Sequence, residues 1–144
     1  MEAAPARPTM AGMSNDKPLV PRSAAFVLTA LLALFMFFLA VRGFFQDVDA
    51  ATGFGLPLAA TADAAWLHVK AGRDLAVGLL FVWLLVLRHR GALFGVLAST
   101  LVIPLNDGLQ VVARDGARVA YALGVHGSAF AFGVLVLVLL WRGR

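Results

Sequence analysis

The fold is decided by an uncharged apolar run at residues 24–41, AAFVLTALLALFMFFLAV. A helix that crosses the hydrocarbon core of a bilayer needs about 20 mostly apolar residues, and this run approaches that length. Three further apolar segments follow at residues 66–87, 92–113 and 117–141. We therefore predict an all-α fold, a four-helix transmembrane bundle formed by residues 23–144.

The composition of the whole chain favours a membrane protein. Of 144 residues, 61% are hydrophobic and 14% are charged, whereas an ordinary soluble domain has about 25% charged residues. A soluble domain of this size could not bury so much apolar surface. No cysteine is present, which excludes disulfides, thiol catalysis and cysteine-ligated metals. The net charge of +4 comes mainly from residues beside the apolar segments, so we expect no nucleic-acid partner.

The connections between the four segments differ in length. Residues 88–91 and 114–116 have the composition of tight turns. Residues 42–65 form a longer link with several glycines, which we predict to be a loop at the membrane interface, with room for a short helix from Ala62. Residues 1–22 are rich in alanine and proline and are predicted to be a disordered cytoplasmic tail, in which Met10 or Met13 are alternative starts to Met1.

The positions of lysine and arginine predict the orientation, because cytoplasmic flanks carry an excess of these residues. One side of the bundle has seven of them. The opposite side has four, Arg42, Lys70, Arg114 and Arg118, together with several aspartates. The seven residues are Arg7, Lys17, Arg22, Arg88, Arg90, Arg142 and Arg144. We therefore expect a multi-pass protein of the plasma (inner) membrane with both termini in the cytoplasm.

Three of the four segments carry polar side chains that hydrocarbon does not tolerate. A charged side chain at the centre of a membrane helix costs about 2.5–3.5 kcal/mol on insertion scales, so such residues usually face the bundle interior and pair. At 1.5 Å per residue the central ones lie at a similar depth, about 9–13 Å from the extracytoplasmic ends of their helices. These are Arg73, Asp74, Asp107 and His126. We predict one ligand pocket in the outer half of the bilayer. Its residues are Lys70, Arg73, Asp74, Asn106, Asp107, Gln110 and His126. The first segment has no such residue, so we expect it to be the most lipid-exposed helix.

The charges of this predicted pocket balance. Lys70 and Asp74 are four residues apart and can pair on one helix face, which leaves Arg73 free to reach Asp107 on another helix. His126 can bridge to either acid or act as a proton carrier. Pro104, one turn before Asp107, removes a helix hydrogen bond and predicts a kink that widens the bundle there.

The interpretation that we favour is a pocket for a small lipid-like or amphipathic ligand, with membrane lipids and a second copy of the chain as further partners. An intramembrane acid–base enzyme of the isomerase, epoxide hydrolase or hydratase type is an alternative. Its candidate catalytic residues are Asp74 or Asp107 as base, His126 as acid and Arg73 as the group that holds an anionic oxygen. A structural subunit of a membrane complex is another alternative. We expect no cofactor, and no metal, because the chain lacks cysteine and paired histidines.

Five short strings in a fixed order suggest a family. They are Gly53-Phe54-Gly55-Leu56-Pro57, Ala64-Ala65-Trp66-Leu67, Lys70-Ala71-Gly72-Arg73-Asp74, Ile103-Pro104-Leu105-Asn106-Asp107 and Gly124-Val125-His126-Gly127. Over roughly residues 25–141 the sequence resembles the small membrane proteins of the domain of unknown function 4267 family. The resemblance implies a four-helix membrane protein and implies no activity.

Overall fold

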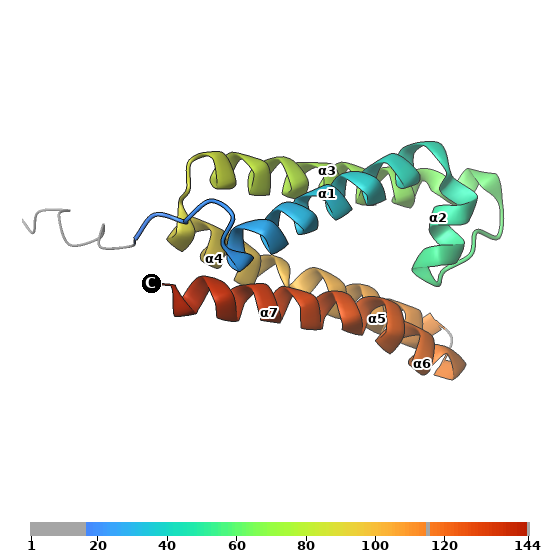
Figure 1. Cartoon of the computed structure of the whole chain (residues 1–144). Helices are drawn as coiled ribbons and strands as arrows, with labels where there is room; N and C mark the ends of the chain where they lie inside the picture. Colours follow the sequence, from blue (N-terminus) through green and yellow to red (C-terminus); the bar gives the residue numbers. More distant parts are fainter. Residues whose placement is uncertain (1–16, 115, 144) are drawn as a thin grey trace, which may run out of the picture.

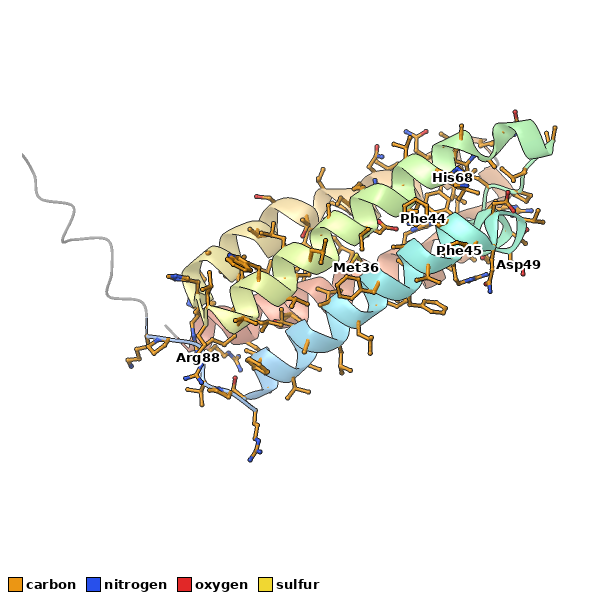
Figure 2. The ribbon with its side chains drawn as sticks, turned by 90° about the horizontal axis from the view of Figure 1, so that it is seen from above. Met36, Phe44, Phe45, Asp49, His68 and Arg88 are labelled. Atoms are coloured by element: carbon orange, nitrogen blue, oxygen red, sulfur yellow. The ribbon has the colours of Figure 1, made fainter. Side chains whose placement is uncertain are left out.

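The structure is a computed structural model that describes residues 17–114 and 116–143, and every regular element in these ranges is a helix. In Figure 1, α1 and α3 form one layer, and α4, α5 and α7 form the other. The short helix α2 covers one end of the bundle. The Arg88 turn lies at the end opposite to Asp49 of α2, as Figure 2 shows from above.

The first layer is a closely packed pair of helices, α1 (Ala24–Phe45) and α3 (Ala65–Val86). Ser23 begins α1 by accepting a hydrogen bond from the backbone N–H of Phe26 at 3.2 Å. Small residues let the two backbones approach, since a Cβ on Gly43 would lie 2.8 Å from Cβ of Ala71. α1 packs along α3 over much of its length, and its outer face is exposed, with Leu34 and Phe38 among its exposed apolar side chains.

The second layer contains two interrupted helices. The predicted third segment divides into α4 (Arg90–Thr100) and α5 (Val102–Arg114), with the break at Leu101, just before Pro104. Because proline has no N–H to donate and crowds the preceding turn, a break is expected there. The last segment consists of η3 (Gly116–Arg118), α6 (Val119–Ala122), the π-helical η4 (Leu123–Gly127) and α7 (Ser128–Arg142).

Most of the link between α1 and α3, which we predicted to be a loop, is helical. It contains α2 (Asp47–Phe54) and the 3₁₀ turn η2 (Thr61–Ala64). Asp47 and Asp49 lie in the first turn of α2, where acidic side chains favour a helix. Gly55 ends α2 at φ +99°, a left-handed conformation that suits glycine.

The predicted tail also differs from the structure in its last residues. Residues 1–16 of that tail lie outside the described residues, whereas Leu19 is fully buried against the apolar core at the Arg88 end. The backbone N–H of Leu19 donates to the carbonyl of Arg88 at 3.0 Å. Leu19 thus packs on the bundle, whereas the residues on either side of it are exposed.

Three helical stretches in the described chain are long and apolar enough to cross a membrane: Ala24–Phe45, Arg90–Arg114 and Val119–Arg142. Large apolar side chains such as Leu34, Val86 and Leu123 are exposed on the outside of the bundle, as lipid contact requires. These features indicate a membrane protein. The remaining long helix, α3, is equally long but contains three charged residues, Lys70, Arg73 and Asp74.

Candidate functional site

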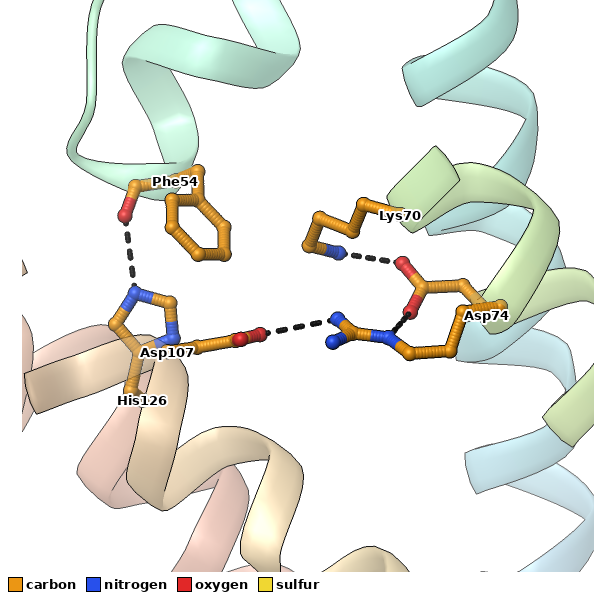
Figure 3. A network of polar contacts seen from close by, with 6 residues as sticks. Phe54, Lys70, Asp74, Asp107 and His126 are labelled. Carbon is orange, nitrogen blue, oxygen red and sulfur yellow. Dashed lines mark hydrogen bonds and ion pairs between the residues drawn. The ribbon is translucent and has the colours of Figure 1, made fainter. Parts of the chain in front are cut away.

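A network of charged side chains joins the two layers near the α2 end of the bundle (Figure 3). Lys70 and Asp74, one turn apart on α3, form an ion pair and hydrogen bond. Arg73 extends in the other direction, and its Nη2 lies 3.3 Å from Oδ2 of Asp107 on α5. Its Nε also lies 3.5 Å from Oδ1 of Asp74. Arg73 is therefore in contact with both aspartates.

The two carboxylates of this network are buried, and its arginine is less so. Asp74 is 3% exposed and Asp107 is 8% exposed, whereas the side chain of Arg73 is 36% exposed. A buried carboxylate is tolerated when a cation and hydrogen bonds compensate for its lost hydration. Lys70 does this for Asp74, and Arg73 does it for Asp107.

His126 lies beside this network but binds a different partner from the one expected. Its Nε2 is 2.9 Å from the carbonyl oxygen of Phe54, the last residue of α2. Because a carbonyl oxygen only accepts, Nε2 must carry the hydrogen, and Nδ1 of the neutral ring is then an acceptor. Gly108 makes room for this ring, since a Cβ at that position would lie 3.2 Å from Cβ of His126. In the described chain the hydrogen bond of His126 thus goes to α2, not to either acid.

Phe54 is a central residue of the site that the sequence analysis named only as part of a motif. Its ring makes edge contacts with the rings of His126 and Trp66, at centroid distances of 4.8 Å and 5.4 Å. The ammonium group of Lys70 lies 5.5 Å from the centroid of the same ring. The Phe54 side chain therefore separates the Lys70–Asp74 pair from His126 at this end of the bundle (Figure 3).

Side chains from the last helical segment hold the C-terminal end of α2. Tyr121 donates its hydroxyl hydrogen to the carbonyls of Thr52 and Gly53, at 3.3 Å and 2.9 Å. Arg118 donates to the carbonyl of Gly55 at 3.3 Å, and His126 donates to that of Phe54. The last carbonyls of a helix have no partner within it, although that of Thr52 also accepts from the backbone N–H of Gly55. A cation at this end also favours the helix dipole. We call Arg118, Tyr121 and His126 the α2 clasp.

A cavity of about 560 Å³ leads from this polar end into the apolar interior between the two layers. Lys70, Asp74, Asp107 and His126 line its polar end, next to Arg42. Its remaining walls are mostly apolar. They include Leu32, Met36, Val77, Phe81, Leu97 and Phe132. The break before Pro104 also faces this space, because Thr100, Leu101, Ile103 and Pro104 line it.

Two residues of the predicted pocket lie elsewhere. Asn106 and Gln110 are exposed and do not line the cavity. In a helix each residue is rotated by about 100° from the one before, so the neighbour of an inward-facing Asp107 faces outward. Arg73 also lies outside the lining and reaches the site through Asp107. The group that faces the cavity is thus smaller than the predicted one.

The arrangement supplies charges, acceptors and an apolar space, which suits an amphipathic molecule.

Comparison with curated proteins and with solved structures gives no significant match. A family profile described as "Domain of unknown function (DUF4267)" matches residues 33–141, which includes the charged network, the α2 clasp and all of the cavity lining except Leu31 and Leu32. The chain therefore belongs to the DUF4267 family.

Proposed function

We propose that this protein binds a small amphipathic, lipid-like ligand within the membrane. The observation on which this rests is the cavity of about 560 Å³, which is apolar along most of its length and charged at one end. Cavities that bind small molecules are typically about 300–1,000 Å³, mostly apolar, with a few polar groups that orient the ligand. The hydrocarbon part would occupy the space between the layers, and the head group would lie near Asp107 and His126.

The length and position of the cavity fit a molecule from the lipid phase. Along α3 the lining runs from Leu67 to Phe81, which is about 21 Å at 1.5 Å per residue. That is about two thirds of the ~30 Å hydrocarbon core of a bilayer. Leu31 and Phe35 of α1 line the cavity and are also exposed, at 51% and 44%. The cavity thus reaches the lipid-facing side of α1, where a ligand can pass sideways from the bilayer.

This function requires that α3 crosses the membrane with the other three stretches, as a four-helix bundle. Two observations support the fourth crossing: α3 is as long as α1 and packs along it, and its charged residues pair within the protein. Large apolar side chains cover its outward face, among them Leu79, Val82 and Trp83. From the lysine and arginine distribution we further propose the plasma membrane, with both termini in the cytoplasm.

The absence of cysteine from the sequence permits a direct test of the crossing. Ala60 and His89 are exposed and flank α3. In intact cells a membrane-impermeant maleimide should label the Ala60→Cys variant, and should label His89→Cys only after the membrane is opened. Labelling of both variants from the same side would show that α3 does not cross. Labelling of His89→Cys alone in intact cells would reverse the proposed orientation.

Ligand binding is tested with three photoactivatable probes that share one long hydrocarbon chain bearing a diazirine. Their head groups are a 1,2-diol, a carboxylate and a quaternary ammonium. The full chain is reconstituted in nanodiscs, and labelled peptides are mapped by mass spectrometry. We expect at least one probe to label cavity-lining residues saturably, and an excess of the unreactive analogue to prevent it. If none of the three does so, the proposed function is refuted.

A matched pair of variants distinguishes the cavity from the lipid-facing surface. Ala129 lines the cavity, whereas Ala131 on the same helix is exposed and lies outside the lining. Ala129→Leu should fill part of the space and weaken the saturable labelling. Ala131→Leu adds the same atoms on the outside and should leave it unchanged. Equal effects of the two substitutions would place the bound probe on the surface.

A further inference from the structure

Two acceptor atoms at the polar end of the cavity, on residues that are themselves mostly buried, have no donor within residues 17–114 and 116–143. Asp107 uses Oδ2 for Arg73, and no hydrogen bond or ion pair joins its Oδ1 to these residues. His126 donates from Nε2 to Phe54, which leaves Nδ1 as an acceptor without a donor from the same residues. Asp107 and His126 are only 8% and 7% exposed, and both line the cavity.

Acceptors that face the cavity can take a hydrogen bond from a molecule that enters it. A buried acceptor without a hydrogen bond is destabilising, so native proteins supply a partner, a ligand or an ordered water. The two acceptors come from α5 and η4, which touch where His126 packs on Gly108. Asp107 and His126 both line this end of the cavity, so a head group that enters it lies beside both residues.

The charges around these acceptors favour a neutral head group. Arg73 already compensates Asp107, and Lys70 compensates Asp74. A cationic head would add a positive charge beside Arg73 and Lys70, and an anionic head would add a negative charge beside two buried aspartates. Like charges close together in a site of low dielectric repel strongly. Arg42, the remaining charged residue of the lining, contacts the ring of Phe38 at 5.7 Å.

We propose that the ligand is a neutral lipid with two free hydroxyl groups, of the long-chain 1,2-diol or monoacylglycerol class. One hydroxyl donates to Oδ1 of Asp107, and the other donates to Nδ1 of His126. The hydrocarbon chain extends from there toward Phe81. This proposal rests on the ligand-binding function proposed above and specifies the chemistry of its head group.

The test compares two unreactive competitors of equal chain length, a 1,2-diol and its dimethyl ether, against the photoactivatable diol in nanodiscs. The ether keeps both oxygen atoms of the diol, but each carries a methyl group in place of the hydrogen that could be donated. We expect the diol to compete at least about tenfold better, because hydrogen bonds to a charged acceptor are among the stronger ones. Equal competition, or saturable labelling by the carboxylate or ammonium probe that exceeds that by the diol, overturns the proposal. In those cases the cavity still binds a lipid, so the proposed function survives.

Substitution of Asp107 then identifies the acceptor. In the Asp107→Asn variant, Arg73 can only donate hydrogen bonds, so it contacts the oxygen of the new side-chain amide. The NH₂ group of that amide then takes the position of Oδ1, where it cannot accept a hydrogen bond from the diol. The preference for diol over ether should fall several-fold. Asn106→Ala changes the adjacent exposed residue, which does not line the cavity, and should keep the full preference. The measured quantity is the ratio of diol to ether competition within one protein sample. Partial loss of folding lowers the labelling for both competitors and therefore does not change this ratio. An unchanged ratio in Asp107→Asn overturns the assignment.

Discussion

The two aspartates of the charged network should respond very differently to loss of their charge. Asp74 is 3% exposed and contacts both Lys70 and Arg73. Asp74→Asn therefore leaves Lys70 without its counter-charge in a site where the lysine side chain is only 16% exposed. Breaking a buried ion pair by removing one partner typically costs about 3–5 kcal/mol. We expect a loss of stability in that range.

Asp107→Asn should be much milder. Arg73 keeps Asp74 at 3.5 Å from its Nε, its side chain is 36% exposed, and the new amide oxygen can still accept from its Nη2. Polar contacts between membrane helices contribute about 0.6 kcal/mol on average and at most about 1.7 kcal/mol. We therefore expect a destabilisation of about 1 kcal/mol, roughly one third of that for Asp74→Asn or less.

The assay is thermal unfolding of the full chain in one detergent, followed by fluorescence-detected size-exclusion chromatography. Both single variants are compared with the parent chain and with the double variant Lys70→Met/Asp74→Asn. Since the double variant removes the stranded charge, it should recover part of the stability that Asp74→Asn loses. If Asp107→Asn unfolds as readily as Asp74→Asn, the reasoning from the double contact of Arg73 is refuted.

Two further predictions concern packing and the α2 clasp. Gly43→Ala should destabilise the protein by about 1–3 kcal/mol because its Cβ would overlap Ala71, whereas Gly72→Ala, which meets no atom within 4 Å, should be neutral or stabilising in the same assay. Equal effects of the two would contradict the close approach of α1 and α3. Tyr121→Phe removes the hydroxyl that donates to Gly53, which should cost about 1 kcal/mol and raise amide hydrogen exchange in α2 several-fold. Exchange that rises equally in α7 would argue against a local role.

The features of the site that follow from local geometry could be predicted from the sequence. Lys70 and Asp74 are one helical turn apart, so their contact depends only on α3 being a helix. Arg73 points away from that pair and thus toward the other layer, where the structure has it against Asp107. The interruption near Pro104 follows from the missing N–H of proline.

Features that depend on tertiary contacts could not be predicted in this way. Helix α2 has eight residues with only Ala51 buried, so its sequence carries almost no helical periodicity. The positions of Asn106 and Gln110 depend on which face of α5 packs against the other helices, and the polar residues of α5 alone do not fix that face. The partner of His126 was missed for the same reason: Phe54 lies in a segment that we predicted to be a loop.

The α2 clasp also has a consequence for how the protein is made. Its hydrogen bonds join residues 63 to 72 positions apart in the chain. At a synthesis rate of about 5–20 residues per second, Arg118, Tyr121 and His126 are made roughly 3–14 s after the end of α2. During that interval the carbonyls at its end have no clasp donors. The polar end of the cavity can therefore be completed only after the last helical segment has been synthesised, which makes docking of α2 a late step of assembly in the membrane.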